Sequence, residues 1–138
     1  MWGILDIPTS GMIAQRIRLE TVAANVANSK AILDADGNYN PYRRRAAEFA
    51  AGDPSASTGS GRQMGVHVAS IWIDQNALRA MHDPSSPYAD ADGNVMVPDI
   101  DPIAEQVNAM EAARGYEANV AAAEALKATM AQVLRLLA

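Results

Sequence analysis

The chain has 138 residues, enough for one ordinary domain, but only 5% of them are aromatic, which leaves little bulk for a dense globular core. Its formal net charge of −5 argues against a surface that binds nucleic acid. Because the chain contains no cysteine, disulfide frameworks, thiolate metal sites and cysteine nucleophiles are excluded.

Residues 8–28 predict the first helix, with Thr9 or Ser10 as its N-cap and an Asn-Ser-Lys exit at 28–30. Its bulky apolar positions are Ile13, Ile17, Val22 and Val26. The residues before it have no basic n-region and only a short apolar run, so no cleavable secretory signal is predicted. No 18 apolar residues occur together, so no membrane-spanning segment is predicted either.

The middle of the chain, 31–101, predicts a β-rich insert, because six of the nine glycines and five of the seven prolines lie between Lys30 and Asp101. Alternation predicts a strand over 64–73 with a bulge or bend near Ala69 and Ser70. Shorter strands are predicted at 95–97 and 39–49. Residues 51–61 are small and polar and predict a mobile loop.

Two copies of Asp-Ala-Asp-Gly-Asn occur, at 34–38 and 90–94. A calcium-binding EF-hand loop needs a carboxylate at its first position, but aligning Gly37 or Gly93 with position six puts Ile32 or Tyr88 there. Asp-Gly is a strong signal for a type I′ hairpin turn, so both copies predict tight turns, not metal sites.

Residues 103–138 predict a second, longer helix, with Asp101 as N-cap, Pro102 at the first helical position and Glu105 in the first turn. At 1.5 Å per residue it would be about 54 Å long. Its apolar positions recur every three or four residues, close to a heptad spacing. The predicted fold is therefore α+β, with the terminal segments 1–30 and 102–138 forming an elongated, coiled-coil-like domain around the insert 31–101.

No enzyme motif is evident. His67 and His82 lie in no recognisable nucleophile, phosphate-binding or metal-ligand spacing, and the acids at 83–101 stand where turn and cap roles explain them. The sequence predicts no catalytic residue, no cofactor and no metal. The one basic run, 43–45, is read as a solvated strand edge.

Three segments carry a family resemblance. The segment 11–28, GMIAQRIRLETVAANVAN, is similar to the signature of flagellar rod, hook and hook-associated proteins, in which a helix ends in an Asn-x-x-Asn pair, here Asn25 and Asn28. The segments DPSSPYADxxGxVxxPxxD at 83–101 and RGYEAN at 114–119 narrow the resemblance to flagellar basal-body rod proteins of the proximal rod. Ser29-Lys30, Gly115 and Pro98-Asp99 depart from the usual pattern.

The resemblance implies a non-enzymatic structural subunit of the bacterial flagellar basal body that assembles axially and transmits torque. Its implied partners are further copies of itself, other rod subunits and the rod-base or export-gate adaptor, with no nucleic acid and no membrane span. It would reach the periplasmic rod through the flagellar type III export apparatus, without a cleaved signal.

A set of side chains on the two helices is predicted to pack between subunits: Ile13, Ile17, Val22, Asn25, Val26, Asn28, Val107, Met110, Arg114, Tyr116, Asn119, Val120, Met130, Leu134 and Leu137. Asn25 and Asn28 either end the first helix by bonding local backbone or contact a neighbour. Tyr116 and Asn119 either contact another subunit or pack within the chain, and Arg114 is a candidate partner for an acid of an adjacent subunit.

Two other function classes remain open at this stage. A soluble coiled-coil adaptor without axial assembly would be a well-folded monomer or dimer. A small hydrolase using His67 or His82 would need one of them for turnover. By contrast, a rod subunit whose helices are completed by neighbours is expected to be weakly ordered alone.

Overall fold

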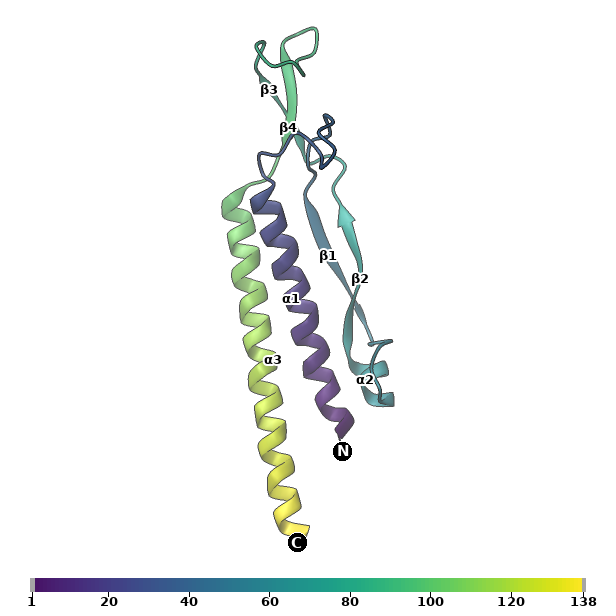
Figure 1. The fold of residues 1–138 in the computed structure, drawn as a ribbon. Coiled ribbons are helices and arrows are strands. Elements are labelled where there is room, and N and C mark those ends of the chain that lie inside the picture. Colours follow the sequence, from purple (N-terminus) through teal and green to yellow (C-terminus); the bar gives the residue numbers. More distant parts are fainter. Residues whose placement is uncertain (1, 138) are drawn as a thin grey trace.

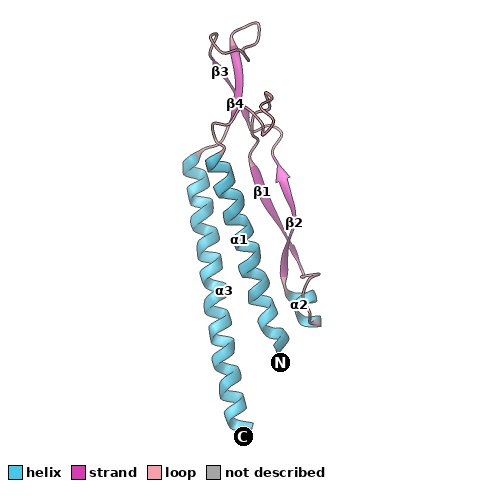
Figure 2. Ribbon diagram, viewed as in Figure 1, coloured by secondary structure: helices cyan, strands magenta, loops and turns pink. Residues whose placement is uncertain are grey.

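Two long helices lie side by side and antiparallel, and the insert between them in sequence runs along one helix and projects past their shared end (Figure 1). The computed structural model describes residues 2–137. Figure 2 shows that the helices and strands form separate layers. The elements in chain order are η1 (Trp2–Leu5), α1 (Asp6–Ala27), β1 (Arg45–Ala51), α2 (Gly59–Met64), β2 (Val66–Ile73), β3 (Leu78–His82), β4 (Asn94–Pro98) and α3 (Pro102–Leu137). The α+β class with helical ends is confirmed.

The start of α1 differs from the prediction, because the chain is already helical in η1 and α1 begins at Asp6. Thr9 and Ser10 are therefore inside the helix, and their hydroxyls donate to the carbonyls of Leu5 and Ile7, each at 2.7 Å. The prediction that one of them is the N-cap is wrong.

The start of α3 follows the sequence signals. The Ile103 N–H donates to Asp101 Oδ1 at 2.9 Å, so Asp101 is the N-cap and Pro102 is the first helical residue. The helix continues for 36 residues to Leu137. Ala138, predicted as its last residue, lies outside the described residues.

Small residues set the spacing of α1 and α3. Ala14 and Ala112 are fully buried, Gly11 lies against the Asn119 side chain, and a Cβ on Gly115 would come within 2.8 Å of Gln15 Nε2. The two backbones therefore approach closely while burying little apolar area. Much of the outer surface of both helices is left apolar and exposed.

An ion pair also joins the helices. Arg18 Nη2 lies 2.9 Å from Glu111 Oε2, across the α1–α3 contact. Glu111 therefore uses Arg18 as its partner, whereas spacing along the helix alone suggests Arg114.

The strands β1 and β2 pair antiparallel over α1, and their register contains the predicted bulge. Glu48 is opposite Ser70 and Phe49 is opposite Val68, so Ala69 has no partner on β1. The first strand begins later than predicted, at Arg45, and Met64 belongs to α2 and not to the strand.

Residues 51–61, predicted as an unpacked mobile loop, are partly ordered against α1. Thr58 Oγ1 donates to Asp6 Oδ2 at 2.6 Å and accepts from the Gly61 N–H at 3.2 Å, so Thr58 caps α2. Gly61 is buried beside Asp6. The prediction that this stretch is too polar to pack is wrong, because a cap and a carboxylate satisfy its polar groups.

The strands β3 and β4 form the projecting hairpin, and β3 had not been predicted. Val95 and Val97 are buried on one face of β4, as their alternation predicts. On the free edge of β4, Tyr39 substitutes for a strand: its hydroxyl donates to the Met96 carbonyl at 2.9 Å and accepts from the Met96 N–H at 3.0 Å. Its ring stacks on Tyr88, with centroids 5.0 Å apart.

Both Asp-Ala-Asp-Gly-Asn copies are tight turns with the same hydrogen bonds. The Gly37 and Gly93 N–H groups donate to the carbonyls of Asp34 and Asp90, each at 3.0 Å. A type I′ turn needs two residues with positive φ, but in residues 2–137 only glycines have positive φ, here 82° at Gly37 and 75° at Gly93. The turns are confirmed and the type I′ assignment is wrong.

Replacing Gly11 with valine is expected to lower the free energy of unfolding by about 1–3 kcal/mol, because the added side chain must displace Asn119 from the α1–α3 contact. Gly59→Val is the matched control, since a Cβ at Gly59 meets nothing within 4 Å. Urea unfolding followed by circular dichroism at 222 nm measures both. Equal stability of the two variants would contradict the close approach of the helices at Gly11.

Candidate functional site

The side-chain amide of Asn25 makes four hydrogen bonds where the two long helices meet the insert. The Asn25 side chain is 0% exposed. Its Nδ2 donates to the Arg45 carbonyl and its Oδ1 accepts from the Arg45 N–H, at 2.8 and 2.9 Å. A side-chain amide therefore pairs with both main-chain groups of the first residue of β1, as a neighbouring strand would.

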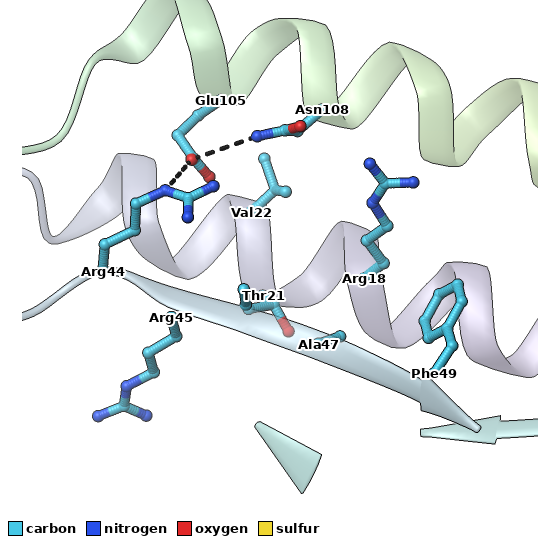
Figure 3. A pocket seen from close by; sticks show the side chains of 10 residues that line it. Arg18, Thr21, Val22, Arg44, Arg45, Ala47, Phe49, Glu105 and Asn108 are labelled. Atoms are coloured by element: carbon cyan, nitrogen blue, oxygen red, sulfur yellow. Dashed lines mark hydrogen bonds and ion pairs between the residues drawn. The ribbon is translucent and has the colours of Figure 1, made fainter. Parts of the chain in front are cut away.

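Glu105 of α3 completes this junction from the other helix. Its side chain is buried, and its Oε2 accepts from Asn25 Nδ2 at 2.8 Å. Its Oε1 lies 2.7 Å from Nε of Arg44, which neutralises the buried carboxylate (Figure 3). We call Asn25, Tyr42, Arg44, Arg45 and Glu105 the junction cluster.

Tyr42 is the fifth member of the junction cluster. Its hydroxyl donates to Asn25 Oδ1 at 3.1 Å, and the Arg45 guanidinium carbon lies 5.1 Å from the centre of its ring. Burial raises the pKa of the Tyr42 phenol, Arg45 opposes this shift, and the charge of Glu105 adds to it.

The basic run 43–45 was predicted to be a solvated strand edge, but two of its arginines have partners within the chain. Arg44 pairs with a buried carboxylate and Arg45 lies over an aromatic ring, although the Arg45 side chain is exposed. The prediction is wrong for Arg44, because its partner Glu105 lies 61 residues away and leaves no local trace.

An open cleft of about 330 Å³ lies beside the junction cluster. Figure 3 shows that its polar side chains come from α1, α3, β1 and Arg44, which directly precedes β1. Two of its three arginines are already engaged, Arg18 with Glu111 and Arg44 with Glu105. The lining residues are Arg18, Thr21, Val22, Arg44, Arg45, Ala46, Ala47, Phe49, Glu105 and Asn108.

The two histidines are far apart in the fold and have structural partners. His67 Nδ1 lies 2.6 Å from the Gly52 carbonyl, and His82 Nδ1 lies 3.3 Å from Asn94 Oδ1. They stand on β2 and β3, which belong to different sheets. The structure does not bring them together.

The acidic side chains hold turns. Asp83 Oδ1 accepts from the Ser85 hydroxyl and N–H, and Asp53 is bonded in the same way by Ser55, which lowers the pKa of the Asp53 carboxyl. Within residues 2–137 no group of three or more His, Cys, Asp or Glu side chains is placed to hold a metal ion.

The two asparagines at the end of α1 bond differently within the chain. Asn28 Nδ2 donates to the Ala24 carbonyl at 2.9 Å, one turn back in the helix. Asn25 instead reaches Arg45, 20 residues ahead, and Glu105.

The remaining predicted packing residues divide by exposure. Val22 is buried within the chain, whereas the others are partly or largely exposed and lie along α1 and α3: Ile13, Ile17, Val26, Val107, Met110, Arg114, Tyr116, Asn119, Val120, Met130, Leu134 and Leu137. Asn119 donates to the Gly115 carbonyl at 2.7 Å and lies against Gly11, which supports its intrachain alternative. The structure does not gather these side chains into one site.

Sequence reasoning missed Arg44 and Tyr42 and assigned Glu105 only to the helix dipole. Each is an ordinary residue in its local context, and only the fold makes them neighbours. All hydrogen-bonding groups of the Asn25 amide have partners within the chain. In the sequence, the one signal for Asn25 was its place in the Asn-x-x-Asn pair.

Comparison with known proteins gives a consistent result over nearly the whole chain. Residues 5–29 match a family model described as "Flagella basal body rod protein". The flagellar basal-body rod protein FlgC of Salmonella typhimurium is 37% identical over 134 residues, covering 96% of this chain and 95% of the relative. The FlgC protein of Bacillus subtilis is 32% identical over 142 residues, with the same coverage. No helix in residues 2–137 is long and apolar enough to cross a membrane.

Replacing Asn25 with alanine is expected to lower the free energy of unfolding by about 2–4 kcal/mol, because the Arg45 N–H, the Arg45 carbonyl and Glu105 Oε2 each lose a buried hydrogen bond. Asn28→Ala is the matched control and removes one bond at a partly exposed helix end, at a cost of about 1 kcal/mol or less. Chemical denaturation measures both variants. Equal decreases in the free energy of unfolding would contradict a larger stabilising role for Asn25 in the junction cluster.

Alkaline pH should weaken the fold through Tyr42. A phenol whose pKa is raised in the folded state contributes stability in full below the ordinary tyrosine pKa of about 10, and this contribution is lost as the pH rises through the higher folded value. Absorbance at 295 nm reports tyrosinate formation. Tyr42→Phe should remove the part of the absorbance rise that occurs above the ordinary tyrosine range; an unchanged rise there in that variant would contradict the assignment to Tyr42.

Proposed function

This chain belongs to the family of the flagellar basal-body rod protein FlgC, and we propose that its two terminal helices pack against other subunits in the proximal rod. Membership makes it a structural subunit of the bacterial flagellar basal-body rod, and so a part of the motility apparatus. The proximal position, the axial mode of assembly and the transmission of torque are parts of the proposal.

The observation that carries this proposal is the incomplete burial of both helices. The buried apolar side chains of α1 and α3 are Pro8, Ala14, Val22 and Ala112, which supply little apolar area for helices of 22 and 36 residues. Large apolar side chains remain exposed on both: Ile13 and Val26 on α1, and Ile103, Val107, Met110, Leu134, Leu136 and Leu137 on α3. Apolar surface of this extent is typical of a protein that is completed by partners.

Coiled-coil-like contacts between subunits are proposed for these exposed positions. On α3, Ile103, Val107 and Met110 are separated by four and three residues and Leu134 and Leu137 by three, which suits the packing of one helix against another. Ile17, Asn28, Tyr116, Val120 and Met130 are partly exposed and belong to the same proposed contacts. Val22 and Asn25 contribute by fixing the chain's own fold.

Charged groups on the outer face of α3 support contacts between subunits as well. Arg114 is exposed, and no ion pair involving it occurs in residues 2–137. An acid of an adjacent subunit is its proposed partner. The rod core would then comprise 1–30 and 102–138, with 31–101 as the insert.

The proposed partners are further copies of this chain, other rod subunits, and the adaptor at the rod base or export gate. Passage through the flagellar type III apparatus without a cleaved signal, and a place in the periplasmic rod, complete the proposal. A narrow helix pair that buries little apolar area is expected to unfold easily, which suits a protein that passes through an export channel. We propose no catalytic role, because both histidines and the turn acids have structural partners.

A soluble adaptor without axial assembly is the alternative, and the family membership disfavours it. Circular dichroism and sedimentation velocity separate the two, since a rod subunit should show weak helicity in dilute monomer that rises on assembly. A stable, fully helical dimer that never assembles further would favour the adaptor.

Leu134→Asp is expected to abolish incorporation into the rod and hence motility, because it puts an unpaired carboxylate into an apolar contact at a cost of several kcal/mol, roughly 2–7. Met64→Asp is the matched control, since Met64 is about as exposed but lies on α2 in the insert. Swimming in soft agar and immunoblots of isolated basal bodies measure the effect. Normal motility of the Leu134→Asp strain would contradict the assignment of this face of α3.

A further inference from the structure

A second open cleft, of about 490 Å³, lies where the end of α1, the segment that follows it and the end of β2 meet. Its lining carries two arginines, Arg43 and Arg45, and one acid, Asp34. The whole chain has a formal net charge of −5, so this cleft is locally opposite in sign to the molecule. We call it the arginine cleft. The other polar side chains that line it are Asn28, Asn40, Tyr42 and Gln75.

The alternation of an extended chain places the two arginines on one side. Arg44 lies between them and points to α3, where its Nε is 2.7 Å from Glu105 Oε1. Figure 3 shows Arg44 directed to Glu105 and Arg45 directed away from it. The Asp74 N–H donates to the Arg44 carbonyl at 2.9 Å, so the pairing of β1 with β2 continues to this residue. Because residues i and i+2 of an extended chain share a face, Arg43 and Arg45 both line the cleft.

Arg43 has a donor that the chain does not satisfy. Its Nε is buried and has no hydrogen-bond partner in residues 2–137, and no ion pair there involves Arg43 or Arg45. A buried donor without an acceptor costs stability, and a guanidinium in a protein keeps its charge. An anion from outside the chain would supply both the acceptor and the opposite charge.

Arg45 is held in place beside the arginine cleft. Asn25 bonds both main-chain groups of Arg45 and also the Tyr42 hydroxyl. The Arg45 guanidinium carbon lies 5.1 Å from the centre of the Tyr42 ring. One amide thus fixes both the backbone of Arg45 and the ring beneath its side chain. A guanidinium that is positioned in advance loses less conformational freedom when it binds an anion.

Asp34 does not neutralise the arginine cleft. Its Oδ1 accepts from the N–H groups of Asp36 and Asn38, at 3.1 and 2.9 Å, and so holds its own turn. In residues 2–137 it forms no ion pair with either arginine. The lining therefore keeps an excess of positive charge.

We propose that the arginine cleft binds a small multivalent oxyanion, a free molecule that carries carboxylate or phosphate groups. The planar fork of a guanidinium matches the oxygens of both groups and binds them in pairs. The volume of 490 Å³ is within the range of small-ligand sites, roughly 300–1,000 Å³. The inference goes beyond the proposed function and uses no contact between subunits.

The bound anion stabilises the fold. The lining comes from the end of α1, from 31–45 and from 73–75, which only the folded chain brings together. A ligand that binds the folded chain and not the unfolded one raises the free energy of unfolding by mass action. Occupancy of the arginine cleft therefore couples the concentration of the anion to the folded fraction of the chain.

Citrate and inorganic phosphate are the probes that test the site. Isothermal titration calorimetry of the full chain at constant ionic strength should show saturable binding of one anion per chain, and urea unfolding should shift to higher urea with the anion present. Sodium chloride at the same ionic strength is the control and should do neither. Binding of citrate alone identifies a carboxylate ligand, and binding of phosphate alone identifies a phosphate ligand. Absence of saturable binding by both anions would overturn the proposal.

Variants of the two arginines locate the binding. Arg43→Gln and Arg45→Gln should each raise the dissociation constant of the anion about tenfold, because each removes one guanidinium fork. Arg79→Gln is the matched control, since Arg79 is an exposed arginine on β3, outside the cleft, and should leave the constant nearly unchanged. Circular dichroism checks that each variant folds. Equal weakening by Arg79→Gln would show that net charge attracts the anion, which would contradict the proposal.

Arg43→Lys separates the fork from the charge. Lysine keeps the positive charge but lacks Nε and the planar pair of donors, so this variant should also bind the anion more weakly. Unchanged binding would contradict the part assigned to the buried Nε. If neither anion binds but Arg43→Gln impairs swimming, the cleft arginines serve a contact with another protein. The anion site is then wrong, and the rod function stands.

Discussion

At the point where the helices and the insert meet, the Asn25 side chain makes the two main-chain hydrogen bonds that a neighbouring strand would make. Arg45 opens β1, which has β2 as its one neighbouring strand, and the Arg45 N–H and carbonyl bond the Asn25 amide of α1. Buried main-chain groups must find partners, and the Asn25 amide offers one donor and one acceptor in the right geometry. Because Glu105 and Tyr42 share the same amide, three distant segments become a single cluster.

Hydrogen bonds and ion pairs fix the relative position of α1 and α3 more than the burial of apolar area does. The close approach of α1 and α3 depends on Ala14, Gly11 and Gly115, which bury little surface. A thin apolar contact by itself resists sliding poorly, whereas the ion pair of Arg18 with Glu111 and the junction cluster each specify one register. The chain thus uses polar contacts to fix its own fold and leaves its large apolar side chains outside, where another molecule could bury them.

The elements with local signals were predictable and those that depend on distant partners were not. Asp101 and Pro102 mark the start of α3, and the change of parity around Ala69 marks a bulge, because both effects act over a few residues. The face of α3 that meets α1 was not predictable, since alanines occupy every side of the helix and apolar spacing favoured the stripe through Val107 that faces away. Thr58 likewise orders part of a polar loop through Asp6, 52 residues earlier.

Unequal helix lengths give the molecule a direction. In a closed antiparallel pair, two helices of equal length cover each other and the ends are alike. Here α3 has 36 residues and α1 has 22, and the extra turns lie at one end only. The β3–β4 hairpin projects at the other end, so the two ends differ in shape. A subunit with two different ends favours head-to-tail contacts over twofold ones, because the same surface does not recur at both ends.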